Sequence, residues 1–293
     1  MSATPIVAAT DGSEESLRAV DWAAGEAVLR GAPLRIVSAA ALLPRMIGGH
    51  AMSGYDTVAD ALRKHRDHAL AVASARAAQA APGLLIDDDA LDGSPAQAVT
   101  EAASGAQMLV VGSRGVGAFA AMLLGSVSRY AATHATCPVA VIREDAGAVH
   151  RQVGVGIGDL EHCGALLDYA FEEAAIRKAS VVALHAWHVP QTDISRAGTA
   201  PARAVADVFQ AEAARELEAL LNGWKEKYPD VPVSQDVVHG HPGRALVGLS
   251  ARADLVVLGR HPAPHGPGTV IHAVLNHAHG PVVTVPSVLP AAG

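Results

Sequence analysis

The sequence predicts an α/β fold made of two tandem domains, each a doubly wound, Rossmann-like unit with a five-stranded parallel sheet. Three observations support this prediction. Short apolar runs alternate with longer helical stretches, the apolar runs show no alternation with polar residues, and the second half repeats the first at a spacing of 147 residues. Strands that are apolar on both faces are typical of parallel sheets covered by helices on each side.

The first half contains five apolar runs that we predict to be strands: Ile6–Ala9, Leu34–Ala39, Leu84–Leu91, Met108–Val111 and Val139–Ile142. Helices are predicted between and after them, over residues 13–31, 56–81, 94–104 and 122–135. Ser94 is a favourable N-cap, and Pro95 suits the first helical position because its missing N–H would have no partner there. Ligands of such sheets bind beyond the carboxyl ends of the strands.

The repeat divides the chain into two domains, residues 1–147 and 148–293. Adding 147 to a position in the first half lands on its counterpart in the second, as the following pairs show: Glu26-Ala27 and Glu173-Ala174, Pro82 and Pro229, Asp89 and Asp236, Gly93-Ser94-Pro95 and Gly240-His241-Pro242. The seam lies within residues 144–152, because the apolar run that follows it resembles the opening of the chain.

Composition excludes several classes of function. The chain has 293 residues, half of them hydrophobic, and a formal charge of −7, which argues against non-specific nucleic-acid binding. No apolar run reaches the 18 or so residues of a membrane span, and the N-terminus does not resemble a secretory signal. Cys137 and Cys163 are far apart in the sequence, which indicates a reduced, cytoplasmic compartment.

The segment VVGSRGVGAFAAMLLGS, residues 110–126, predicts a phosphate site. Gly125 and Ser126 begin a predicted helix, whose N-terminal N–H groups favour an anion, and Ser128 adds a hydroxyl. Gly112 and Gly115 let the backbone cross a sugar and a phosphate without a Cβ clash, and Arg114 supplies positive charge. No lysine precedes Ser126, which excludes a P-loop, and the spacing of the glycines is not that of the dinucleotide fingerprint.

The spacing Gly-2x-Gly-9x-Gly-Ser resembles the ATP-binding motif of the universal stress protein family. The segments TDGSEES, LVVGSRG and HATCPVAVI agree with this resemblance, and the duplication resembles the tandem members of actinobacteria over nearly the whole chain. The resemblance implies bound ATP, with or without Mg²⁺, a ribose contact from Asp11 and an adenine contact from the backbone of Ala39. The implied nucleotide-binding residues of the first domain are Thr10, Asp11, Ala39, Gly112, Arg114, Gly115, Gly125, Ser126, Val127 and Ser128.

The second half keeps part of this set. Its implied counterparts are Asp159, Ala186, Gly259, Gly268 and Thr269. Pro262, however, replaces Gly115 in a loop that is four residues shorter, and proline fixes φ and lacks a donor N–H. The sequence leaves open whether this rigid loop still covers a nucleotide.

Most of the fifteen histidines belong to the second half, and His239, His241, His261 and His265 are predicted to lie in loops at the ligand end of the sheet. Two interpretations are open: a site for Zn, Ni or Cu, or neutral histidines that fill a relaxed loop. No pair of them stands on a helix with a carboxylate partner, so we assign no metal site.

The function that these features favour is ATP binding by a regulatory protein of the stress response, which signals through nucleotide-dependent protein contacts. The last strand of each half is expected to be a sheet edge that pairs, and the resemblance implies a homodimer. The alternative is a slow ATP hydrolase related to the adenine-nucleotide α-hydrolases. TDGSEES lacks the Ser-Gly-Gly of their pyrophosphatases, and no catalytic residue is assigned. No nucleic-acid or membrane partner is expected.

Overall fold

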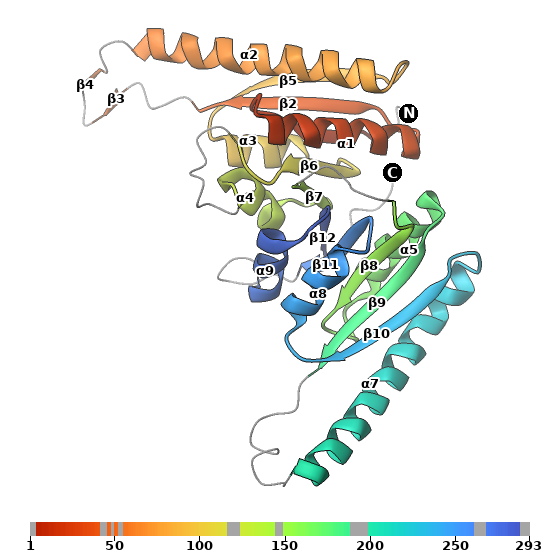
Figure 1. The fold of residues 1–293 in the computed structure, drawn as a ribbon. Helices are drawn as coiled ribbons and strands as arrows, with labels where there is room; N and C mark the ends of the chain where they lie inside the picture. Colours follow the sequence, from red (N-terminus) through yellow and green to blue (C-terminus); the bar gives the residue numbers. More distant parts are fainter. Residues whose placement is uncertain are drawn as a thin grey trace. The chain divides into compact units, whose positions relative to one another are not determined.

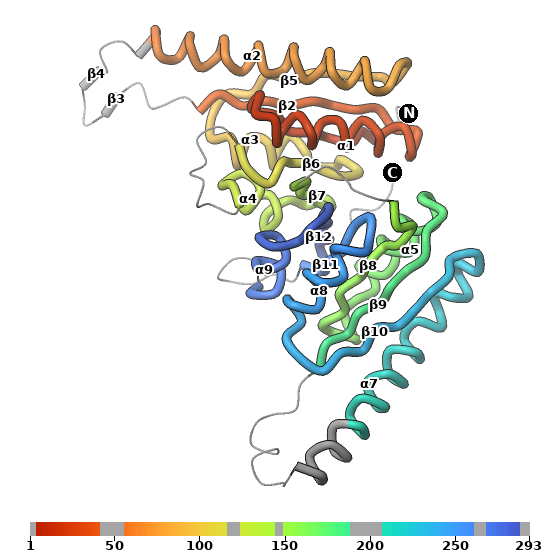
Figure 2. Tube along the Cα trace, viewed as in Figure 1, coloured from red at the N-terminus to blue at the C-terminus, as the bar shows by residue number. Residues whose placement is uncertain are grey.

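The computed structural model describes residues 4–41, 46–47, 50–51, 55–115, 124–143, 149–187, 199–260 and 268–287, with the backbone alone at 46–47, 50–51, 55 and 199–206. Segments outside these ranges are grey in Figure 2. The described residues form two compact units, the first reaching to Arg143 and the second beginning at Val149. None of the described helices is long and apolar enough to cross a membrane.

The first unit is a parallel sheet with helices on both faces. Its elements are β1 (Ile6–Ala9), α1 (Glu14–Arg30), β2 (Leu34–Ala40), β3 (Met46–Ile47), β4 (His50–Ala51), α2 (Tyr55–Ala80), β5 (Ile86–Asp92), α3 (Pro95–Ala102), β6 (Met108–Gly112), α4 (Ser126–His134) and β7 (Val139–Ile142). Within this unit the strand order is β7-β6-β1-β2-β5, and all of these pairs are parallel. Helices α1 and α2 pack on one face, and α3 and α4 on the other (Figure 1).

The largest completely buried side chains of the first unit belong to its sheet, as the apolar sequences of its strands indicate. Ile6, Leu34, Ile36, Met108 and Leu109 are completely buried, because helices cover both sides of the central strands. The predicted doubly wound α/β architecture is confirmed. The strand order reverses between β1 and β6, so the loops that follow these two strands diverge to opposite faces and leave room for a ligand at that end.

Two local features of the first unit differ from the sequence prediction. Strand β5 begins at Ile86 and not at Leu84, because the N–H of Leu84 donates to the carbonyl of Ala81 and closes a turn first. The short strands β3 and β4 pair with each other in an antiparallel ladder, which no periodic pattern in the sequence indicated.

The second unit repeats the first. Its elements are β8 (Gln152–Ile157), α5 (Gly164–Arg177), β9 (Ser180–Trp187), α7 (Thr199–Lys227), β10 (Val233–His239), α8 (Pro242–Ser250), β11 (Leu255–Arg260), α9 (Thr269–His277) and β12 (Val282–Pro286). The strand order within the unit is β12-β11-β8-β9-β10, again all parallel. Helices α5 and α7 cover one face, and α8 and α9 the other.

The strand register preserves the sequence repeat. Ile6 pairs with Leu34 in the first unit, and Val153 pairs with Val181 in the second, so both partners are displaced by 147 residues. Leu109 pairs with Val139, whereas Val256 pairs with Val282. The last strand is therefore displaced by 143 residues, and the four missing residues lie wholly between β11 and β12.

Strand β8 differs from β1 in its contact with the helix above it. A Cβ atom at Gly154 would lie 2.7 Å from Leu249 Cδ2, and one at Gly156 would lie 2.8 Å from Leu246 Cδ2. Both leucines belong to α8 and are buried. The two glycines therefore let α8 pack directly on the strand.

We expect Gly156→Ala to destabilise the second unit, because the added methyl group would lie 2.8 Å from Leu246 Cδ2 and 2.9 Å from Leu258 Cδ2. Overpacking a core in this way lowers the free energy of unfolding by about 1–3 kcal/mol. Urea unfolding followed by fluorescence in a Trp22→Phe background measures the change, since Trp187 and Trp224 then report on the second unit alone.

Gly223→Ala is the matched control, because Gly223 lies within α7 and nothing stands within 4 Å of its added Cβ. This substitution is expected to leave the stability unchanged or to raise it by about 0.5–1 kcal/mol. Equal midpoints for the two variants would contradict the packing role of Gly156.

Candidate functional site

The ligand end of the first unit is formed by three segments that follow strands. They are the turn after β1, the loop that leaves β6, and the N-terminus of α4, and all are described as far as Gly115 and again from Leu124. The end of β2, with Ala39, lies next to β1 in the sheet. The fold therefore brings the predicted residues of the first domain to one end of its sheet.

The turn after β1 is held by its own side chains. Asp11 Oδ1 accepts hydrogen bonds from the backbone N–H of Ser13 at 3.0 Å and from its hydroxyl at 2.6 Å. The N–H of Gly12 donates to Thr10 Oγ1 at 3.2 Å, and the Thr10 and Ser16 hydroxyls are 3.0 Å apart. Ser13 also caps α1 by accepting from the N–H of Ser16. One oxygen of the Asp11 carboxylate is thus fixed by the turn.

The other carboxylate oxygen of Asp11 faces the glycine loop. A Cβ atom at Gly115 would lie 2.1 Å from Asp11 Oδ2, so only glycine fits beside the carboxylate in this arrangement. Gly112 has a different neighbour, because its Cβ would lie 2.9 Å from the backbone carbonyl oxygen of Glu15 in the first turn of α1. Gly112 therefore has a packing role in addition to the role that the motif implies.

The N-terminus of α4 is joined to the loop after β6. The N–H of Gly125, the N-cap, donates to the carbonyl of Ser113 at 2.7 Å, and the buried Ser128 hydroxyl donates to the carbonyl of Gly112 at 2.5 Å. The hydroxyl proton of Ser128 is therefore used within the fold, and its backbone N–H is what it offers to an anion. Ser126 is exposed, and it opens the helix with Val127. The first N–H groups of any helix lack partners within the helix.

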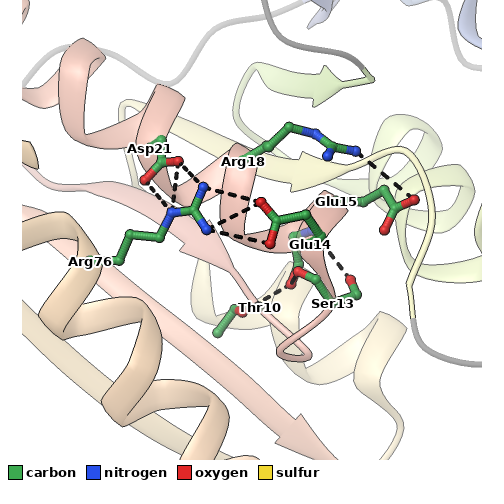
Figure 3. A network of polar contacts seen from close by, with 8 residues as sticks. Thr10, Ser13, Glu14, Glu15, Arg18, Asp21 and Arg76 are labelled. Carbon is green, nitrogen blue, oxygen red and sulfur yellow. Dashed lines mark hydrogen bonds and ion pairs between the residues drawn. The ribbon is translucent and has the colours of Figure 1, made fainter.

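Charged side chains surround this end of the unit. Arg114 and Arg18 lie 3.8 Å and 4.0 Å from the same carboxylate oxygen of Glu15. Arg76, from α2, joins two carboxylates of α1: its Nε donates to Asp21 at 2.9 Å and its Nη1 to Glu14 at 3.2 Å (Figure 3). The hydrogen bond with Asp21 is the main cause that raises the pKa of Arg76 above its usual value.

The corresponding turn of the second unit is built differently. Gly156 occupies in β8 the register position that Ala9 occupies in β1. Asp159 stands three residues after Gly156, whereas Asp11 stands only two residues after Ala9. Asp159 Oδ1 accepts from the N–H of Glu161 at 2.9 Å, and Asp159 Oδ2 lies 2.9 Å from Nδ1 of His162. Both carboxylate oxygens of Asp159 therefore have partners within the turn.

The end of β9, which includes the predicted Ala186, carries an aromatic cluster that no pattern in the sequence indicated. The Trp187 indole N–H donates to Gln210 Oε1 at 2.6 Å, and Gln210 Nε2 donates to the carbonyl of Val237 at 2.7 Å. The rings of His239 and Phe209 lie 4.6 Å and 6.1 Å from the Trp187 ring, centroid to centroid. Trp187 is nearly buried by these neighbours.

The first unit has an ion-pair network at the same place. Ala40 and Asp92 pair at the ends of β2 and β5, as Trp187 and His239 do at the ends of β9 and β10. Arg66 Nη1 donates to Asp92 Oδ1 at 2.5 Å and to the carbonyl of Leu91 at 3.2 Å, and Arg63 lies 3.5 Å from Asp92. The two units thus differ at this register position, which has ion pairs in the first unit and aromatic contacts in the second.

The phosphate loop of the second unit lies partly outside the described residues. The predicted loop residues His261, Pro262 and His265 are among those that the structure does not describe. Gly259 makes an ordinary contact, since its Cβ would lie 3.4 Å from Leu166 Cδ2. Gly268 is the N-cap of α9, which begins at Thr269. Among the residues that the structure describes, no three His, Cys, Asp or Glu side chains are arranged to hold a metal ion.

Comparison with known proteins finds relatives along both units. The universal stress protein family model matches residues 3–143 and 150–286. A universal stress protein of Mycobacterium tuberculosis strain H37Rv is 34% identical over 95% of each chain, and another, of strain CDC 1551, is 35% identical over 95% of this chain and 93% of its own. A solved universal stress protein structure from Archaeoglobus fulgidus has a TM-score of 0.69 at 18% identity, covering 98% of this chain and 100% of that one, which supports the fold.

The hydrogen bonds of the Asp159 turn lead to a prediction about the pKa of the Asp159 carboxyl. The N–H of Glu161 is the main cause that lowers the pKa of the Asp159 carboxyl, and the hydrogen bond with His162 is the next. A carboxyl whose pKa is lowered by folding stabilises the folded state above its unfolded pKa, and that stabilisation is lost as the pH falls through the folded pKa. We expect His162→Ala to raise the pKa of Asp159 part of the way towards its usual value. A carboxyl-carbon NMR titration measures this.

Glu161→Ala serves as the control, because it removes a neighbouring side chain but keeps the backbone N–H that Asp159 accepts from. The pKa of Asp159 should stay below its usual value in both variants. A full return to the usual value in His162→Ala would show that the backbone hydrogen bond has no effect, contrary to this assignment.

Proposed function

The chain belongs to the universal stress protein family, and we propose that it is an ATP-binding regulatory protein of the stress response that holds its nucleotide in the first domain. The observation that carries the proposal is the position of the Asp11 carboxylate. One oxygen is fixed by Ser13, and the other faces Gly115 in the loop after β6. A carboxylate held in this way suits the hydroxyl groups of a ribose, which donate hydrogen bonds.

The phosphate end of the proposed site is the N-terminus of α4. The backbone N–H groups of Ser126, Val127 and Ser128 and the partial positive charge of the helix favour an anion there. The exposed Ser126 hydroxyl adds a donor. Arg114 lies 3.8 Å from Glu15 and is long enough to move from that carboxylate to a phosphate. This arrangement supports ATP, with or without Mg²⁺, as the ligand, with Ala39 as the adenine contact.

The second domain is proposed to bind no nucleotide in the same manner. Both oxygens of Asp159 have partners in their own turn, and the side chain of Trp187 is packed against Gln210 and His239 beside Ala186. Gly259, Gly268 and Thr269 alone would then remain of the implied set.

We further propose that the protein acts in the cytoplasm as a homodimer, and that it signals through regulatory protein partners that recognise the nucleotide-bound form.

The test is the nucleotide content of the purified protein. The protein is denatured, the supernatant is separated on an anion-exchange column, and the nucleotide is compared with the protein concentration before and after ATP is added. We expect one adenine nucleotide per chain. None, even with added ATP, would overturn the proposal, whereas two would show that the second domain also binds. Metal-dependent ADP production faster than about one per minute would favour the hydrolase, a threshold set well below typical turnover.

Gly115→Ala is expected to weaken ATP binding at least tenfold, about 1.4 kcal/mol, because the new Cβ would lie 2.1 Å from Asp11 Oδ2 and must displace the carboxylate. Isothermal titration calorimetry measures the loss. Gly25→Ala is the control, since it adds the same methyl group within α1, where nothing lies within 4 Å. Undiminished binding by Gly115→Ala would show that Asp11 does not contact the nucleotide.

A further inference from the structure

Helix α2 contacts the turn that carries Asp11. Nε2 of His65 lies 3.1 Å from the backbone carbonyl oxygen of Asp11. Because a carbonyl only accepts hydrogen bonds, Nε2 of the imidazole must carry the proton and act as the donor. His65 is exposed and lies 54 residues from Asp11 in the sequence, so the contact is a tertiary one.

A second contact from α2 lies one helical turn further on. A Cβ atom at Gly12 would lie 3.2 Å from the Cβ of Ala69, and Gly12 has a positive φ of 82°. Residues four apart on a helix share one face, so His65 and Ala69 meet Asp11 and Gly12 from the same side. Two successive residues of the turn are therefore held by two successive turns of α2.

The same helix also contacts β5, the strand on the other side of β2 from β1. Arg66, next to His65, donates to the carbonyl of Leu91 at 3.2 Å and to Asp92 at 2.5 Å, at the end of β5. In the sheet, β2 lies between β1 and β5. Helix α2 is therefore fixed at both neighbours of the strand end where Ala39 stands, and its position relative to the Asp11 turn is well defined.

We propose that His65 is a positioning residue for the nucleotide site of the first domain. Its hydrogen bond to the carbonyl of Asp11 fixes the backbone of the turn, while Ser13 fixes Oδ1 of the same residue. Because the backbone carbonyl and Oδ1 of Asp11 are both held, Oδ2 keeps the direction in which it faces Gly115 and the ligand. This inference rests on the proposed function, because it assigns His65 a role in presenting Asp11 to the nucleotide.

The position that corresponds to His65 in the second domain holds no such donor. Glu212 stands 147 residues after His65, and an ionised carboxylate cannot donate a hydrogen bond to a carbonyl. The next residue, Ala213, packs against Trp187 in place of the contacts that Arg66 makes. The proposed positioning role therefore belongs to the first domain alone, as does the intact glycine loop.

The test compares three variants of the full chain by calorimetric titration with ATP. His65→Ala removes the donor, and we expect ATP binding to weaken five- to tenfold. His65→Gln keeps an N–H donor at a similar reach, and we expect affinity within twofold of the unchanged protein. His68→Ala is the matched control, because this exposed histidine of α2 makes no hydrogen bond with any residue described in the structure.

A second readout is independent of the nucleotide. The N–H of Ser13 donates to Asp11 Oδ1, so its amide hydrogen exchange should be faster in His65→Ala and not in His68→Ala. Unchanged ATP affinity in His65→Ala would overturn the positioning role and leave the proposed function intact. Equal losses in His65→Ala and His65→Gln, or an equal loss in His68→Ala, would also overturn it. If the protein without any substitution bound no ATP, this result would overturn the proposed function as well.

Discussion

The close approach of α1 to the end of β6 is the constraint on which the candidate site depends. Gly112 has no Cβ, so the backbone of Glu15 can lie against the strand end at a distance that any other residue would obstruct. This approach brings the turn before α1 beside the loop after β6, and Asp11 thereby meets Gly115. In the second unit, a Cβ added at Gly259 would make only an ordinary contact with the side chain of Leu166, and α5 begins later, at Gly164. The two turns differ because the two helices approach their sheets differently.

Periodicity, glycine spacing and duplication were sufficient to predict the fold and the residues at the end of the first sheet. Buried strands without alternation, and the repeat at 147 residues, are local or linear signals that a sequence displays directly. The contacts from α2 leave no such signal, because His65 and Arg66 are polar residues of a long helix whose partners lie in other segments. The offset of Asp159 was also missed. The repeat at 147 residues would have found it, because it places Gly158, and not Asp159, at the counterpart of Asp11.

The two units stabilise the corresponding strand ends, those of β2 and β9, by different interactions. In the first, partly exposed arginines and Asp92 join α2 to β5 through ion pairs, which typically contribute little to stability in water but leave polar groups near the surface. In the second, Trp187 packs against Gln210, His239 and Phe209, and burial of a large aromatic ring contributes more. The first solution is compatible with an open, polar ligand end. The second places a buried aromatic ring at the strand end.

The confinement of the four-residue length difference to one loop has an evolutionary consequence. Strand pairing on either side of that loop is the same in both units, since Val256 meets Val282 just as Leu109 meets Val139. A change in loop length therefore altered one end of the sheet without disturbing the hydrophobic core that folding requires. Duplication adds a second freedom, because one copy can accumulate substitutions while its twin retains the ancestral chemistry. Selection can then diversify the two ends separately on a single inherited scaffold.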